Sequence, residues 1–349
     1  MQLIGASEDR STEIGFYLYS SSIGANILIR VGLMVSMKFY HHKYLKAVHT
    51  VSVSSCSKHL YTVKKFIQSI VVCGTSFSVV LLKTHIGLYD GMENYIIANA
   101  NHAWSLSCFT WPCRHVNLVG VNPTTFAFGI FGWASRFAGN LLEQIARDGI
   151  LLSALTLGNC ATAFRFKKRL KDANEIPIDA VTVGTEIRNE YKWIKKVSKH
   201  INSAFNIVFR FFLLANIFMF AVFVDEWFNP QVGKVAKGVK LVNVVFVCIT
   251  FYYANQTAKT GDRFREWMKK EKNRTALGMS EMEVVMENSS WSSIGFGRGA
   301  LYIYDSTLIG FASAVAAYYF GIVETRPQYI EYEPENCCVC TNTTNSSSF

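Results

Sequence analysis

The sequence predicts an all-α fold: a polytopic bundle of six to seven transmembrane helices. Half of the 349 residues are hydrophobic and only 17% are charged, whereas a soluble domain usually carries about 25% charged residues. Several apolar runs reach the roughly 20 residues that a helix needs to cross a bilayer. The chain has only 6 prolines, which argues against a loop-rich all-β protein.

Seven segments fit this length and composition. The first carries Arg30 and, because no basic n-region or cleavage site precedes it, is expected to be a retained span. The third contains Pro123 and is interpreted as a span, a half-span or an interfacial segment. The fourth begins through Arg147 and Asp148, and the fifth holds Arg210, which we expect to snorkel toward water. The predicted spans are 14–37, 66–82, 117–137, 145–164, 201–224, 239–258 and 300–323.

Lysine and arginine indicate the orientation of these spans, because cytoplasmic loops carry an excess of both. They are dense in 165–199 and again in 263–274, and the two spans between these stretches place both on the cytoplasmic side. The last span then leads outward, so the tail 326–349 is expected outside the cell. Glycosylation sequons at Asn342 and Asn345 agree with an extracellular tail.

The N-terminal half is less consistent. The stretch 38–65 holds six lysines and no acid, so it also looks cytoplasmic. Three spans between this stretch and 165 put it outside, and two put it inside. Either the basic rule fails here, or 117–137 does not cross fully.

Charge and motifs exclude several classes of protein. The net charge of +10 is typical of nucleic-acid binding or of a membrane protein's cytoplasmic loops. We favour the second, because the basic residues cluster beside apolar spans and no basic–aromatic alternation indicates nucleic-acid binding. No nucleophile or metal signature stands out, and His41-His42 lacks further ligands. The sequence therefore predicts no enzyme, no metal and no cofactor.

Nine cysteines are irregularly spaced, and three of them cluster near the C-terminus. Lipidation, disulfide pairing and no role at all remain open for this cluster. Its members are Cys337, Cys338 and Cys340.

The last predicted span carries a spaced pattern that extends to Thr325. Its positions are Gly299, Tyr302, Asp305, Ala317-Tyr318, five apolar residues and Glu324-Thr325. This pattern resembles the last-span motif of the invertebrate gustatory receptor family, relatives of the insect odorant receptors. That motif has Gly, an aromatic and Asp, then Thr-Tyr, five apolar residues and Gln-Phe. Tyr318 and the spacing are kept, whereas the other three signature side chains differ.

A second stretch carries the same resemblance. From Tyr191 to Phe205 apolar residues recur every three or four positions, which predicts an amphipathic helix continuous with the following span. This stretch, including Asn202, is similar to the family's segment before its fifth span. The resemblance covers about 145–325 and describes a divergent member of the family.

The resemblance implies a seven-span protein of the plasma membrane with an internal N-terminus and an external C-terminus. It further implies a ligand-gated cation channel, assembled as a homo- or heterotetramer with related subunits and opened by a small-molecule tastant. The last span is then expected to line the pore, with an anchor between subunits at its cytoplasmic end and a ligand pocket among the outer halves. A chain lacking one N-terminal span of its relatives is a third interpretation of the basic stretch 38–65.

Pore candidates follow from this placement. Tyr318 lies in the motif, Phe320 and Val323 are expected to narrow the pore, and four copies of Glu324 would form an acidic ring that favours cations. The alternative for Glu324 is an interfacial acid paired with Arg326. Small residues along this span also suit ordinary close helix packing.

Two further candidates lie elsewhere. Asp305 is expected to pair with a base such as Arg298 or to cap a helix. Aromatic residues are candidate pocket walls, although such stripes are more often packing, and no ligand pocket is assigned. These are Phe211, Phe212, Phe218, Phe220 and Phe223, with Phe126, Phe128, Phe131 and Trp133.

Two other functional classes compete with a channel. The first is a seven-span receptor-like membrane protein that does not conduct and acts in signalling or trafficking. The second is a transporter, which is disfavoured because neither an internal repeat nor paired broken spans with intramembrane acids stand out.

Overall fold

The computed structural model is helical throughout the residues that it describes, and no strand occurs among them. The described residues are 10–53, 63–85, 88, 91–110, 120–164, 166–167, 180–228, 233–289, 294–297 and 303–324. The helices are α1 (Arg10–Val53), α3 (Val63–His85), α4 (Met92–Thr110), α5 (Pro123–Ala163), α7 (Ala180–Phe228), α8 (Lys234–Met268), α9 (Glu271–Ala276), α10 (Glu281–Ser289) and α11 (Asp305–Glu324).

Helix α5 is one uninterrupted helix of 41 residues, about 61 Å long at 1.5 Å per residue. It begins where the Asn122 side chain accepts a hydrogen bond from the Thr125 N–H and Pro123 occupies the first turn. It contains most of 117–137 and nearly all of 145–164, so these two segments are not separate spans joined by a turn. Two separate spans are therefore not confirmed here, because α5 continues as a helix through Asn140, Glu143 and Gln144, the polar residues between the segments.

Helix α4 was not predicted as an element, because asparagines interrupt its apolar residues. It packs along α5 at very close range, with the Asn99 carbonyl of α4 facing Gly132 of α5. Tyr95 of α4 also donates from its hydroxyl to the Thr84 carbonyl of α3, at 2.9 Å. Because Gly132 has no side chain, the backbones of α4 and α5 can approach each other closely.

Replacing Gly132 by alanine is expected to destabilise the protein by about 2 kcal/mol through overpacking. An ideal Cβ at this position would lie only 1.9 Å from the Asn99 carbonyl oxygen, so the backbone of α4 must move. The measurement is the free energy of unfolding of the detergent-solubilised chain. Gly74→Ala in α3 is the control, because nothing lies within 4 Å of its Cβ position; equal losses in both variants would contradict this packing.

Helices α7 and α8 are the ones long and apolar enough to cross a membrane among the described residues, over Thr182–Phe228 and Lys234–Met268. With 49 and 35 residues they measure about 73 and 52 Å, well beyond a hydrocarbon core of about 30 Å. The predicted helix from Tyr191 to Phe205, continuous with the following span, is confirmed within α7. Helix α8 runs ten residues past the predicted end of its span at Ala258.

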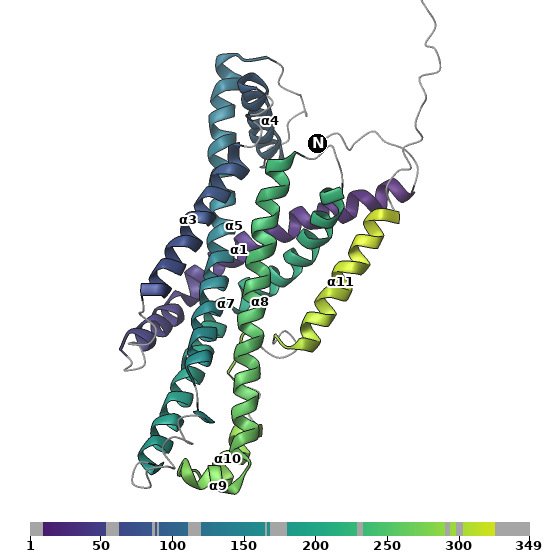
Figure 1. Cartoon of the computed structure of the whole chain (residues 1–349). Helices are drawn as coiled ribbons and strands as arrows, with labels where there is room; N and C mark the ends of the chain where they lie inside the picture. The colour runs from purple at the N-terminus through teal and green to yellow at the C-terminus, as the bar shows by residue number, and fades with distance from the viewer. Residues whose placement is uncertain are drawn as a thin grey trace, which may run out of the picture.

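The long helices meet in two apolar cores. The main core joins α1, α5, α7 and α8 through residues such as Ile29, Ile150, Phe212 and Ala254. The second core lies at the lower end of Figure 1, where α5, α7 and α8 extend toward α9 and α10. It is rich in aromatic rings, namely Phe164, Phe166, Tyr191, Phe264 and Trp267.

Helix α1 runs antiparallel to α7. Gly32 of α1 faces Phe211 of α7, whereas Tyr44, later in α1, packs on Phe205, earlier in α7. In Figure 1 the start of α1 and the end of α11 lie near each other at the right-hand side of the bundle. The expected internal N-terminus and external C-terminus stay a prediction.

Candidate functional site

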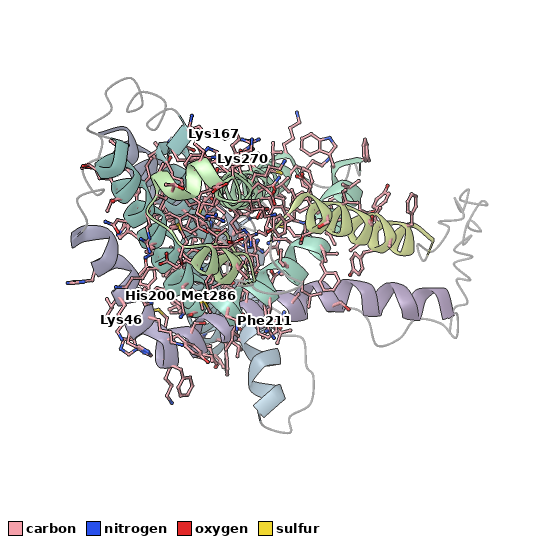
Figure 2. All side chains as sticks on the ribbon, turned by 90° about the horizontal axis from the view of Figure 1, so that it is seen from below. Lys46, Lys167, His200, Phe211, Lys270 and Met286 are labelled. Carbon is pink, nitrogen blue, oxygen red and sulfur yellow. The ribbon has the colours of Figure 1, made fainter. Side chains whose placement is uncertain are left out.

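Helix α11 stands at the side of the bundle, and both overall views show it projecting there beside α1 (Figures 1 and 2). None of its described side chains, 305–321, is fully buried, and Ile309 and Phe320 are 68% and 60% exposed. One face packs on α7, where Val315 and Tyr318 contact Ala221 and Val222. The opposite face carries small residues and is open. These exposed small residues are Ser306, Gly310, Ala312, Ser313, Ala316 and Ala317.

The predicted pore residues divide between these faces. The Tyr318 ring packs on Phe218 of α7 with centroids 4.6 Å apart, so it is a packing residue in the single chain. Phe320 lies on the open side. Val323 and Glu324 end α11, but their side chains lie outside the described residues, as does Arg326.

The chain that leads into α11 is tied to α7 by side-chain hydrogen bonds. The Asn202 amide donates to the Gly295 carbonyl at 2.9 Å and accepts from the Gly297 N–H at 3.0 Å. The Ser198 hydroxyl also donates to the Gly295 carbonyl, at 2.6 Å. Residues 294–297 are buried, and Gly297 has a φ of 100°, in the left-handed region that favours glycine. We call 294–297 the linker segment.

Helix α10, which precedes the linker segment, is held by the same face of α7. The Tyr191 hydroxyl and the Lys195 ammonium contact Glu287 at 2.9 and 2.7 Å. Arg188 pairs with Glu283. The Ser280 N–H donates a hydrogen bond to Glu283, and this bond, together with the nearby Arg188 charge, lowers the pKa of the carboxyl. The acid therefore stays ionised and keeps its pairing with α7.

Asp305 fastens the first turn of α11 to α8. Its carboxylate accepts from the Asn255 amide at 2.7 Å and pairs with Lys259 at 3.0 Å. The partner expected from the sequence, Arg298, lies outside the described residues. Tyr191, Asn202 and Asp305 thus each join α7 or α8 to a part of the chain between α10 and the first turn of α11.

A second polar site lies inside the main bundle, around Glu143 of α5. This carboxylate is 4% exposed and accepts from Arg147 Nε at 3.1 Å. Lys83 of α3 and Arg30 of α1 approach it to 3.2 and 3.4 Å. One buried carboxylate therefore joins three helices through three cations. We call these four residues the buried charge cluster.

Amides extend the buried charge cluster to further helices. Arg147 donates to Asn216 of α7 at 2.6 Å and to Asn26 of α1 at 3.3 Å. Asn216 lies in the most apolar part of α7 and is fully buried. One helical turn beyond Gln144, Asp148 accepts from the Ser76 hydroxyl at 2.7 Å. These polar groups of α5 are thus paired with neighbouring helices, whereas Gln144 Oε1 is buried without a hydrogen-bond partner among the described residues.

Sequence reasoning noted Arg30, Arg147 and Asp148 within apolar stretches but missed Glu143. The reason is its place in the gap between two predicted spans, where low hydropathy is usual for a turn. Ionisable residues that recur within several apolar segments were the available signal, because such groups tend to pair with one another in a bundle.

The predicted pocket aromatics occupy two different settings. On α7 the rings fill helix contacts: Phe212 is in the main core, Phe220 meets Phe311 of α11 at 5.5 Å, and Phe223 meets Trp227 at 5.3 Å. On α5, Phe126 and Phe131 are 50% and 59% exposed. Arg210, expected to snorkel, is also exposed.

The cysteine cluster and the glycosylation sequons of the tail lie outside the described residues. The chain matches no protein-family model, and it has no significant match to a curated protein.

Proposed function

We propose that the chain is a gustatory-type chemosensory receptor of the plasma membrane and acts as a ligand-gated cation channel whose pore is lined by α11. The observation that carries this proposal is the open face of α11. An apolar helix with small side chains on one face and a packed opposite face is suited to meet copies of itself around an axis. In such an assembly Phe320 would face the axis, and the end of α11 at Glu324 would bring carboxylates together.

The two-core architecture supports the same proposal. The main bundle matches a membrane domain, and the second core matches a cytoplasmic anchor built from the extensions of α5, α7 and α8. Basic residues at this lower end, such as Lys196 and Lys270, favour the cytoplasmic side. The end of α11 at Glu324 then faces outward.

In this proposal the contacts of α7 couple ligand binding to the opening of the pore. A ligand that binds one arrangement of the outer helices more tightly shifts the population of that arrangement. Because α7 holds both α10 and the linker segment, a shift of α7 carries the start of α11 with it. The side-chain bonds at Tyr191, Asn202 and Asp305 are the points of transmission.

Cysteine accessibility along α11 tests the pore assignment. Ala316→Cys is expected to react with a charged thiol reagent applied to open channels and to lose most of its current. Val315→Cys is the matched control, because Val315 packs against α7 and should stay unmodified. The background replaces exposed cysteines, including Cys73 and Cys248, by serine.

Three outcomes separate the alternatives. Block at Ala316→Cys alone supports a pore lined by α11. Reaction at both positions without block indicates a lipid- or water-exposed helix away from the conduction path. Surface expression without any current from the parent chain, over a broad ligand panel, favours the non-conducting receptor.

A further inference from the structure

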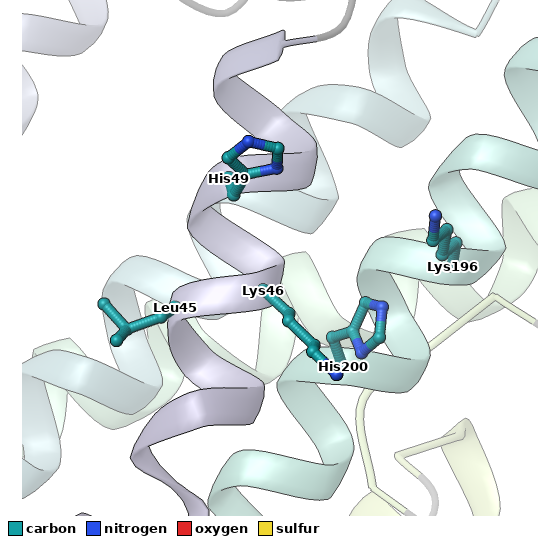
Figure 3. A pocket seen from close by; sticks show the side chains of 5 residues that line it. All are labelled: Leu45, Lys46, His49, Lys196 and His200. Carbon is teal, nitrogen blue, oxygen red and sulfur yellow. The ribbon is translucent and has the colours of Figure 1, made fainter.

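A basic pocket lies between α1 and α7 near the end of the main bundle (Figure 3). Its volume is about 540 Å³, and four of the five described side chains that line it are basic. Leu45, Lys46 and His49 come from α1, and Lys196 and His200 come from α7. Among the residues that the structure describes, no carboxylate lines it. We call this the basic pocket.

Further positive charge surrounds the basic pocket. Partial burial lowers the pKa of His200, and so do the charges of Lys196, Lys46, Lys199 and Lys43. Burial and the neighbouring positive charges thus both disfavour a charged His200 imidazole. A bound anion would offset these charges, so an anionic ligand is favoured here over any cation or neutral group.

The position of the basic pocket along α7 indicates which kind of anion it would bind. His200 immediately precedes the apolar stretch of α7 that begins at Ile201, so the pocket sits at the boundary between polar and apolar surface. Its wall also includes Leu45, which is 60% exposed, and Phe39 farther up α1 is 58% exposed. Basic side chains beside exposed apolar ones suit a ligand with a phosphorylated head and an acyl tail.

We propose that the basic pocket binds the phosphorylated headgroup of an anionic membrane lipid, of the phosphoinositide class, and thereby bridges α1 and α7. The ammonium groups of Lys46 and Lys196 contact the phosphates from the two helices, and His49 and His200 donate from the same wall. Bridging of this kind fixes the turn of α7 from which Ser198 and Asn202 bond the linker segment. Lipid binding at this site therefore stabilises the position of α7.

The test measures binding of the full chain to lipid nanodiscs that contain either a phosphoinositide or phosphatidylserine at equal total charge. The test variant is Lys46→Gln with Lys196→Gln. The matched control is Lys270→Gln with Lys272→Gln, which removes two exposed charges near α9. In Figure 2, Lys46 and His200 lie together, whereas Lys270 lies on the other side of this end.

The expected result is saturable phosphoinositide binding that weakens about 25-fold in the test variant, at about fivefold per lysine. The control variant should change by less than about twofold, since its lysines lie outside the pocket. Soluble inositol trisphosphate should compete only weakly, because it lacks the acyl chains. Thermal unfolding of both variants checks that each remains folded.

Three results overturn the proposal. Equal binding to phosphatidylserine would reduce the effect to surface charge. Equal weakening in the control variant would place the ligand elsewhere. Competition by inositol trisphosphate at the affinity of the lipid would assign the pocket to a soluble phosphate instead. Because every readout is binding, these results stand whether or not the chain conducts ions.

Discussion

The Glu143→Gln variant is expected to lose about 3–5 kcal/mol of unfolding free energy. Glutamine keeps the shape of the side chain but removes the charge that Arg147, Lys83 and Arg30 share. Arg147 is itself 5% exposed, so its charge would remain buried without a carboxylate at Nε. A domain is typically stable by only about 5–15 kcal/mol, so this loss should be visible as reduced yield and a lower unfolding temperature.

The comparison variant for Glu143→Gln is Glu266→Gln on α8. Glu266 pairs with Lys269 at 2.6 Å, but its side chain is 70% exposed, and exposed ion pairs contribute only about 0–1 kcal/mol. Adding Lys83→Met to Glu143→Gln should recover part of the stability, because one uncompensated cation is then removed. A small and equal loss in both glutamine variants would mean that the buried charge cluster is solvated.

The sequence predicted those helices whose apolar residues repeat with a regular helical period. Helix α7 is an example, because its apolar residues keep a helical period from Tyr191 into the span. The pattern failed around residue 143. There the hydropathy of α5 falls because Glu143, Gln144 and Arg147 are polar, and their pairing with α1, α3 and α7 has no local signature in the sequence.

The candidate site, too, was predicted only in part from the sequence. Two separate stretches of the resemblance singled out Asp305, Tyr191 and Asn202, and the structure places their contacts along the chain from α10 to α11. The actual partners, Lys259, Glu287 and the linker backbone, lie 46 to 96 positions away along the chain, so no spacing rule identifies them. The small residues of α11 likewise indicated a close contact, but not which face would be open.

Asn202→Ala is expected to loosen the linker segment from α7. The variant removes both bonds that the Asn202 amide makes to the linker segment, and leaves the buried Gly297 N–H without this acceptor. An unsatisfied buried backbone group costs about 1–3 kcal/mol. We therefore expect faster hydrogen exchange at 294–297 and, if α11 lines a pore, a ligand-evoked current at least tenfold smaller at equal surface expression.

The matched control for Asn202→Ala is Asn206→Ala, one helical turn further along α7 and partly exposed. It should leave both hydrogen exchange and current close to those of the parent. Unchanged exchange at 294–297 in Asn202→Ala would contradict the tether itself. Faster exchange with an unchanged current would retain the tether but contradict its role in gating, because a linker that moves freely could not then transmit a shift of α7 to α11.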